Sequence, residues 1–223
     1  MNSPRFAIRL ACNDISRARA FYKKTSFNEE HFDEKNKRSW QTDKGLVLCL
    51  QEGQQTSPAL TIYPNDVDKE LDRLDELGIV MNYEADAEGN NFEATFSDPA
   101  GNALIIADHR ELPQGLYEKM GEESPLKELS LPGVAQFIDS MNFWLALGFE
   151  VQPAQAQPHP WAVFKAGNIS VGIHQSELWK QAGLCFHKAQ NPYKLKWEQT
   201  QIKVYSHVDK AAEICGCAIY QLP

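Results

Sequence analysis

Two stretches of this 223-residue chain repeat each other, and that repeat constrains the fold more than any other feature of the sequence. Residues 14–27 and 138–149 share one pattern, in which Phe21-Tyr22 corresponds to Phe143-Trp144. In the first copy Asp14 precedes apolar residues at helical spacing, namely Ile15, Ala18, Phe21 and Tyr22. This arrangement predicts a capped amphipathic helix that packs on a sheet and is followed by a strand.

A second pair of similar stretches lies at residues 60–69 and 202–210, each with a strand-like run followed by a helix start. The helix of the first stretch continues to Gly78, which is placed as a glycine just past the helix end. The other stretch ends near Gly216. The sequence therefore predicts four modules with the order strand, helix and three strands, at residues 5–53, 57–109, 126–177 and 200–223.

The four modules predict two domains and a linker. We expect a first domain at 1–110, a linker at 111–125 and a second domain at 126–223, in which the third module is complete and the fourth is truncated. The second module closes with the turn Asp98-Pro-Ala-Gly-Asn102 and a strand, whereas the chain stops at Pro223 before a comparable strand can follow. The resulting unpaired sheet edge should be covered by residues 182–198 or by a second copy of the chain, as a homodimer.

Composition narrows the classes of partner. Thirty acidic and 22 basic residues give a net charge of −8, which disfavours nucleic acid and anionic membranes as partners. There is no apolar run of about eighteen residues and no secretory signal, and the five cysteines lack zinc or disulfide spacing. We therefore expect a cytoplasmic protein with reduced thiols.

Three sequence marks together resemble the vicinal oxygen chelate superfamily, which includes glyoxalase I, bleomycin-resistance proteins and extradiol dioxygenases. They are Phe21-Tyr22, Leu147-Gly148-Phe149 and the turn at 98–102. The resemblance implies an α+β fold in which repeated βαβββ modules form an open, barrel-like mixed sheet around a cavity. In this chain a second, incomplete copy would follow the first.

The metal-ligand positions of the superfamily carry unsuitable residues here. By the family's spacing they fall on Ala7, Cys49, Ala59 and Ile105 in the first half, and on Leu129, Gly172 and Gln201 in the second, with no position left on the closing strand. A divalent metal needs three or four converging His, Glu, Asp or Cys donors. The resemblance therefore implies a protein without metal or other cofactor that binds a small organic ligand in its cavity.

Strand alternation identifies candidate ligand-binding residues in the first half. Arg9 shares a face with Ala7 and Ala11, and it either captures a carboxylate or phosphate of an anionic ligand or forms an ion pair with an inward-facing acid. By the same alternation Cys49 and Gln51 share a face, as do Thr61 and Tyr63. Tyr63 either offers a phenol donor to a ligand or packs in the core.

In the second half Gly172 and His174 correspond to Cys49 and Gln51. His174 is the best candidate for a catalytic general base, although a hydrogen-bonded structural histidine fits the same position. Trp161 either stacks on an aromatic ligand or belongs to the core. The sequence thus leaves open whether the chain only binds a ligand or is a metal-independent lyase or isomerase that uses His174 or Arg9.

Overall fold

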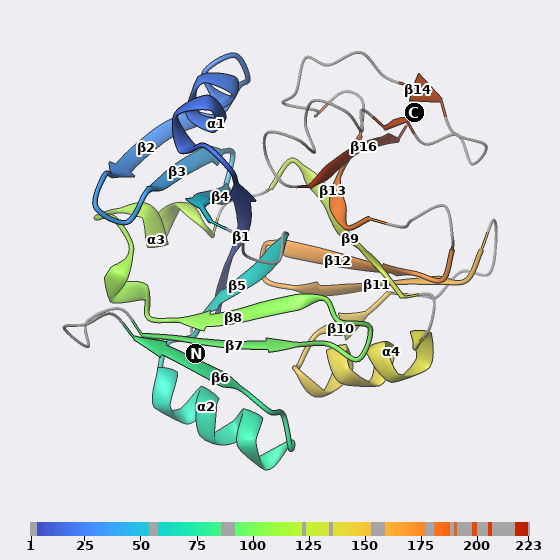
Figure 1. Ribbon diagram of the computed structural model, residues 1–223. Helices are drawn as coiled ribbons and strands as arrows, with labels where there is room; N and C mark the ends of the chain where they lie inside the picture. Colours follow the sequence, from blue (N-terminus) through green and yellow to red (C-terminus); the bar gives the residue numbers. More distant parts are fainter. Residues whose placement is uncertain are drawn as a thin grey trace.

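The structure is a computed structural model, and it describes residues 4–53, 58–85, 92–121, 124–133, 136–152, 159–176, 181–187, 190, 198–199, 205–206 and 217–222. These residues form two eight-stranded mixed sheets with a few helices (Figure 1). In each sheet the two outermost strands are not paired with each other, so neither sheet closes into a barrel. The α+β fold with repeated modules and open sheets is therefore confirmed.

The first sheet has the strand order β2-β3-β4-β1-β5-β8-β7-β6. Its strands are β1 (Arg5–Cys12), β2 (Asn28–Asp33), β3 (Arg38–Asp43), β4 (Leu46–Glu52), β5 (Ala59–Tyr63), β6 (Asn82–Ala85), β7 (Phe92–Ser97) and β8 (Ala103–Ala107). The central strand β1 runs parallel to β4 and antiparallel to β5. Helices α1 (Ile15–Tyr22) and α2 (Val67–Glu76) follow β1 and β5, as the module pattern predicts.

Local sequence signals explain where these two helices begin and end. The Asp14 carboxylate accepts a hydrogen bond from the Arg17 amide at 3.0 Å, and Asp66 accepts one from the Lys69 amide at 3.2 Å. Beyond α2, Gly78 has a φ of +74°, which favours glycine. The predicted cap at Asp14 and the glycine after the second helix are therefore confirmed, and Asp66 caps the second helix in the same way.

The second sheet repeats the first strand for strand, with the order β10-β11-β12-β9-β13-β16-β15-β14. Its strands are β9 (Leu126–Pro132), β10 (Glu150–Val151), β11 (Trp161–Ala166), β12 (Ile169–His174), β13 (Gly183–His187), β14 (Glu198–Gln199), β15 (Tyr205–Ser206) and β16 (Ala218–Leu222). Helix α4 (Phe137–Ala146) follows β9 as α1 follows β1.

The fourth module begins earlier than the sequence predicts. Its first strand is β13, which pairs antiparallel with β9, and not the stretch near residue 202, which lies outside the described residues. Strand β16 pairs parallel with β13, as β8 does with β5, so the chain does contain a closing strand after all. Part of the 182–198 segment thus belongs to the sheet that it was expected to cover. The domain boundaries and the homodimer stay predictions.

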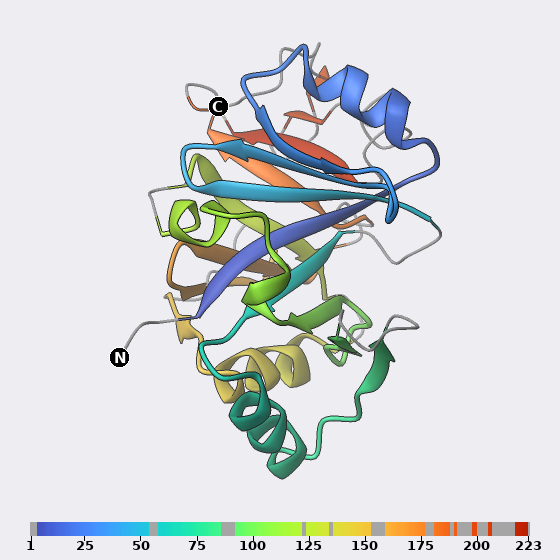
Figure 2. The same cartoon turned by 90° about the vertical axis from the view of Figure 1, so that its left-hand side faces the viewer.

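Two apolar clusters lie on opposite faces of the strands. The larger one joins helix-facing side chains of both halves, including Ile8, Leu10 and Trp144. The halves also meet directly, because the rings of Phe6 and Phe149 lie 5.6 Å apart in a T-shaped arrangement. In Figure 2 the helices α2 and α4 lie side by side, and Arg73 of α2 donates to the Ala146 carbonyl at 3.0 Å.

The smaller cluster lies on the inner face of the first sheet and is covered by a short helix. After β8 come the 3₁₀ helix η1 (His109–Glu111) and α3 (Leu116–Lys119), and α3 lies in the segment 111–125 that was expected to be a linker. The buried Leu116 and Met120 pack against the inner residues of this sheet. No described helix is long and apolar enough to cross a membrane.

Candidate functional site on the inner faces of the two sheets

The inner face of the first sheet is largely apolar. Ala7, Cys49, Ala59 and Ile105 all lie in its buried cluster, while Ile8 and Leu10 face the helices, as strand alternation predicts. Burial raises the pKa of the Cys49 thiol, so the only side chain of the four with a metal-binding atom is held in its neutral form. These four residues do not fit a metal ion.

Arg9 points into this face and is paired with an acid that sequence reasoning missed. Its two terminal nitrogens donate to the Glu93 carboxylate at 2.6 and 2.8 Å, and Arg38 donates to the same carboxylate at 2.8 Å. Burial works against the charge of Glu93, but the two guanidinium groups hold its pKa below the ordinary value. Of the two interpretations of Arg9, the ion pair with an inward-facing acid is the one that the structure contains.

The other candidates on this face lie around the same ion pair. Gln51 accepts a hydrogen bond from Arg38, and Tyr63 packs in the buried cluster beneath α3. The Thr61 hydroxyl and the Nε atom of Arg9 are buried without a hydrogen-bond partner. The structure therefore brings Arg9, Cys49, Gln51, Thr61 and Tyr63 together, but under a helical cover and beside a carboxylate that already neutralises Arg9.

The two sheets can be compared residue by residue because their second hairpins have the same turn. A two-residue turn joins the strands in both the β3–β4 hairpin and the β11–β12 hairpin. Leu46 is therefore equivalent to Ile169, and Leu48 to Val171. Leu48 lies opposite Ile8, and Val171 lies opposite Leu129. Leu129 is therefore the counterpart of Ile8, and Glu128 is the counterpart of Ala7.

The prediction that Leu129 occupies the first ligand position is thus wrong by one residue. Leu10 precedes the first helical residue, Ile15, by five positions, whereas its counterpart Leu131 precedes Phe137 by six. The extra loop residue shifts the count, and a shift of one residue moves a side chain to the other face of a strand. The closing strand of the second half, which was expected to be missing, is β16, and its Tyr220 is the counterpart of Ile105. The remaining predicted position, Gln201, lies outside the described residues.

Glu128 and His174 form the centre of the second inner face. The Nε2 atom of His174 lies 2.6 Å from Oε1 of Glu128, and the side chains of both residues are 2% exposed. Ser130 donates to the same carboxylate oxygen at 2.9 Å. On its other side, Nδ1 of His174 lies 3.1 Å from Nε2 of His159, which is half-buried. A chain of hydrogen bonds thus leads from a partly exposed histidine to a buried carboxylate.

The second oxygen of Glu128 has no partner among the residues that the structure describes. Oε2 is buried and accepts no hydrogen bond from them, which is costly for a carboxylate in a low-dielectric interior. Gly172 makes room for this carboxylate, because a Cβ atom there would lie 2.4 Å from Oε1. The Trp161 ring stacks on His174 with its centroid at 5.2 Å, and its Nε1 atom is also buried without a partner.

The surroundings of this face favour the neutral forms of His159 and Cys185. Burial, and next the neighbouring His174, lower the pKa of His159, so the neutral imidazole is favoured. A neutral His159 can donate from Nε2 to His174, which can in turn donate from Nε2 to Glu128. Burial also raises the pKa of Cys185, which keeps its thiol protonated.

This donor set does not fit a metal ion. Both ring nitrogens of His174 face other side chains, and the counterpart of Cys49 is Gly172, which has no donor. Among the residues that the structure describes, no three His, Cys, Asp or Glu side chains are placed to hold a metal. The predicted residues His174 and Trp161 do lie together. Glu128 and His159 were not predicted, because nothing in the sequence except their residue type marks them as members of the site.

Comparisons with known proteins support the fold. No family model and no curated protein matches the sequence. Among solved structures, an extradiol ring-cleaving dioxygenase from B. fuscum is 14% identical, and the match covers 99% of this chain and 72% of that chain with a TM-score of 0.64. The 2,3-dioxygenase LapB from Pseudomonas sp. KL28 is 10% identical, with 98% and 91% covered and a TM-score of 0.63. This chain therefore has the fold of the extradiol dioxygenases, which confirms at the level of fold the resemblance to the vicinal oxygen chelate superfamily.

Proposed function

We propose that this chain binds a small organic molecule on the inner face of its second sheet, without a metal ion. The observation that carries the proposal is the unpartnered Oε2 atom of Glu128. Buried carboxylate oxygens in proteins are almost always hydrogen-bonded, so an open acceptor beside Trp161 and His174 indicates a place for a donor. Trp161 and His159 are both partly exposed, which puts this end of the face nearest to solvent among its described residues.

The charge of the face decides what kind of ligand fits. An anionic ligand was expected because of Arg9, but Glu93 already neutralises that side chain on the other sheet. On the second face the charged group is a carboxylate, which repels anions and accepts hydrogen bonds. The ligand we propose is therefore a neutral or cationic molecule with hydroxyl or amine donors, and a planar ring would suit the Trp161 indole.

Catechol is a suitable probe, because it is planar and carries two adjacent hydroxyl donors. We expect it to bind in a calorimetric titration at pH 7, and 1,2-dimethoxybenzene, which cannot donate, to bind at least about tenfold more weakly. Glu128→Gln should weaken catechol binding, whereas Glu118→Gln, which removes an exposed carboxylate of α3, should not. Equal binding of the two probes, or catechol binding unchanged in Glu128→Gln, would contradict the proposal.

The absence of a metal is tested separately. The donor set at Glu128, Gly172 and His174 supports a metal-free site, since no three donors converge in the part of the chain that the structure describes. Elemental analysis of the purified protein should find no stoichiometric zinc, iron, manganese or nickel. One equivalent of any of these metals, lost on substitution of Glu128, would overturn this part of the proposal.

A second candidate function is acid–base catalysis, and the chain from His159 through His174 to Glu128 favours it. Such a chain can hold the imidazole of His174 in one orientation and carry a proton to the surface. Deuterium exchange at the carbons next to the carbonyl of hydroxyacetone, a neutral ketone, followed by NMR in D₂O, would detect a general base. Exchange that is faster than in buffer and abolished in His174→Gln would support catalysis; exchange unaffected by that change would exclude His174 as the base.

A further inference from the structure

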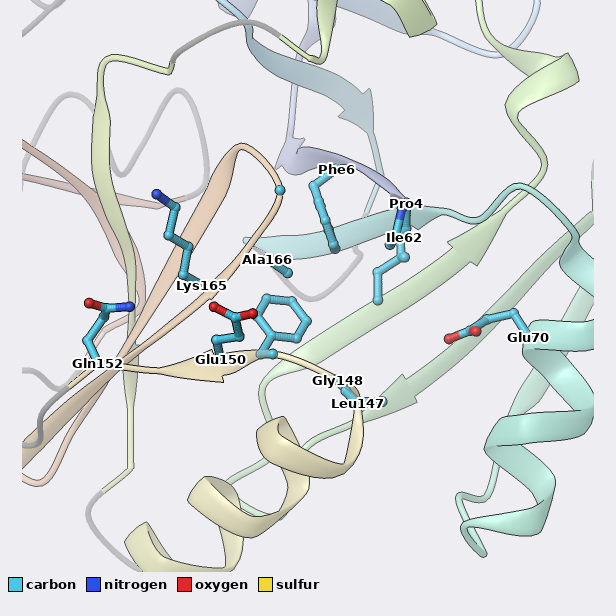
Figure 3. A pocket seen from close by; sticks show the side chains of 12 residues that line it. Pro4, Phe6, Ile62, Glu70, Leu147, Gly148, Glu150, Gln152, Lys165 and Ala166 are labelled. Carbon is cyan, nitrogen blue, oxygen red and sulfur yellow. The ribbon is translucent and has the colours of Figure 1, made fainter. Parts of the chain in front are cut away.

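A pocket of about 460 Å³ lies between the two halves of the chain, away from both inner faces. It is lined by β1 and β5 of the first sheet, by α2, and by β10, β11 and the turn after α4 in the second half (Figure 3). Volumes of this size are typical of small-molecule sites, which favour boundaries between structural units. None of the residues discussed above as ligand-binding candidates lines it.

The floor of the pocket is apolar and rigid. Phe6, Ile62 and Phe149 line it, and they are only 2%, 5% and 5% exposed, so their packing is that of the core. The T-shaped contact between the two phenylalanine rings fixes the rings relative to each other. An apolar ligand group on this floor would bury surface at roughly 25 cal/mol per Å² without rearranging the protein.

Acidic groups face the floor from two sides. Figure 3 shows the Glu150 side chain on one side of the pocket and the Glu70 side chain reaching in from α2 on the other, whereas the Lys165 ammonium points away from the floor. Glu70 is held by Arg73 through two hydrogen bonds of 2.6 and 3.1 Å. Glu150 lies opposite Lys165 on the neighbouring strand β11, but its exposed side chain makes no hydrogen bond or ion pair with any residue that the structure describes. Glu150 is therefore the group that is available to a ligand.

We propose that this pocket binds an organic monocation with an apolar body, such as an arylalkyl amine. The apolar body lies on Phe6, Ile62 and Phe149, and the ammonium group lies beside the Glu150 carboxylate, where the neighbouring aromatic ring face adds a favourable cation–π contribution. The net charge of −8 raises the local concentration of cations around the chain. This site is independent of the one proposed on the second sheet.

Three phenyl-substituted probes of similar size and different charge test the proposal by calorimetry or ligand-observed NMR at pH 7. We expect 2-phenylethylamine to bind in the millimolar range, 2-phenylethanol to bind more weakly, and 3-phenylpropionate not to bind detectably. Added salt should weaken amine binding, because the carboxylate is exposed. Stronger binding of the anion would mean that Lys165 dominates the pocket, and would overturn the proposal, as would the absence of amine binding.

Two substitutions locate the bound amine. Glu150→Gln keeps the size of the side chain and should weaken amine binding about fivefold while leaving the alcohol unchanged. Glu84→Gln, which removes an exposed carboxylate on β6, is the matched control and should have no effect. Ala166→Leu, which fills the pocket, should abolish binding of amine and alcohol alike. Amine binding that is unchanged in both Glu150→Gln and Ala166→Leu would place it elsewhere and contradict the proposal.

Discussion

His174 and Glu128, 46 residues apart in sequence, meet on the inner face of the second sheet with 2.6 Å between Nε2 and Oε1. The counterparts of these residues on the first sheet are Gln51 and Ala7, which make no such pair. The two sheets thus share a backbone pattern but place different chemistry inside. The first holds an ion pair around Glu93, and the second holds a carboxylate with an open oxygen.

Gly172 should be needed to hold the Glu128 carboxylate where it is. In Gly172→Ala the new Cβ would lie 2.4 Å from Oε1 and 2.5 Å from the carboxylate carbon, so the side chain must move. We expect a loss of about 1–3 kcal/mol in the free energy of unfolding, measured with urea. In a Glu128→Ala background the same substitution should cost much less, because the clash is gone. An equal cost in both backgrounds would show that Gly172 acts through the backbone alone.

Glu93→Ala should destabilise the chain strongly, because it leaves the guanidinium of Arg9, which is 2% exposed, without its partner. Breaking a buried pair from one side typically costs about 3–5 kcal/mol. The double variant Arg9→Met with Glu93→Leu should regain most of that loss, since the buried guanidinium leaves together with its partner, and Arg38 is partly exposed and still donates to Gln51. Urea unfolding of the three proteins checks this, and a cost below about 1 kcal/mol for Glu93→Ala would refute it.

Glu111 should make the stability of the chain fall between mildly acidic and neutral pH. Burial, and next the nearby Glu93 and Asp108 carboxylates, raise the pKa of Glu111 from 4.5 to about 7. Between these values the unfolded chain has lost the proton that the folded chain keeps, so rising pH favours unfolding until the folded carboxyl also ionises near pH 7.

The variant Glu111→Gln tests this dependence. Its amide oxygen can still accept the hydrogen bond that the Phe92 amide donates at 2.6 Å, but it carries no charge. The variant should equal the native chain at pH 4 and exceed it by about 1 kcal/mol at pH 8, allowing for solvent screening of a half-exposed group. Glu84→Gln is the control. If the free energy of unfolding of the native chain equals that of Glu111→Gln at every pH, the pKa of Glu111 is not raised.

Trp144→Phe should weaken the junction between the two halves. The indole Nε1 donates to the Asp98 carboxylate at 3.2 Å, and Asp98 is 4% exposed. Losing a hydrogen bond to a buried charged group costs about 1.5–3 kcal/mol. A double-mutant cycle with Asp98→Asn, measured by urea unfolding, isolates the energy of the interaction between Trp144 and Asp98. If the two substitutions are additive, the contact contributes nothing to stability.

The sequence by itself determined the elements and their faces. Asp14, Asp66 and Gly78 mark helix ends through local hydrogen bonds and backbone geometry, and strand alternation correctly put Arg9 inside the first sheet. The matching of Gly172 and His174 to Cys49 and Gln51 also follows from short-range pattern, because both hairpins have the same turn. These features depend on residues that are close in the chain.

Only the tertiary structure decided which side chains meet. Glu93 reaches Arg9 because β7 lies in the same sheet as β1, and Glu128 reaches His174 because β9 pairs with β12. A single extra loop residue before α4 moved the predicted position from Glu128 to Leu129, on the opposite face. Partners of this kind are set by strand order and register, which depend on the packing of the whole sheet and are not encoded in any short stretch of sequence.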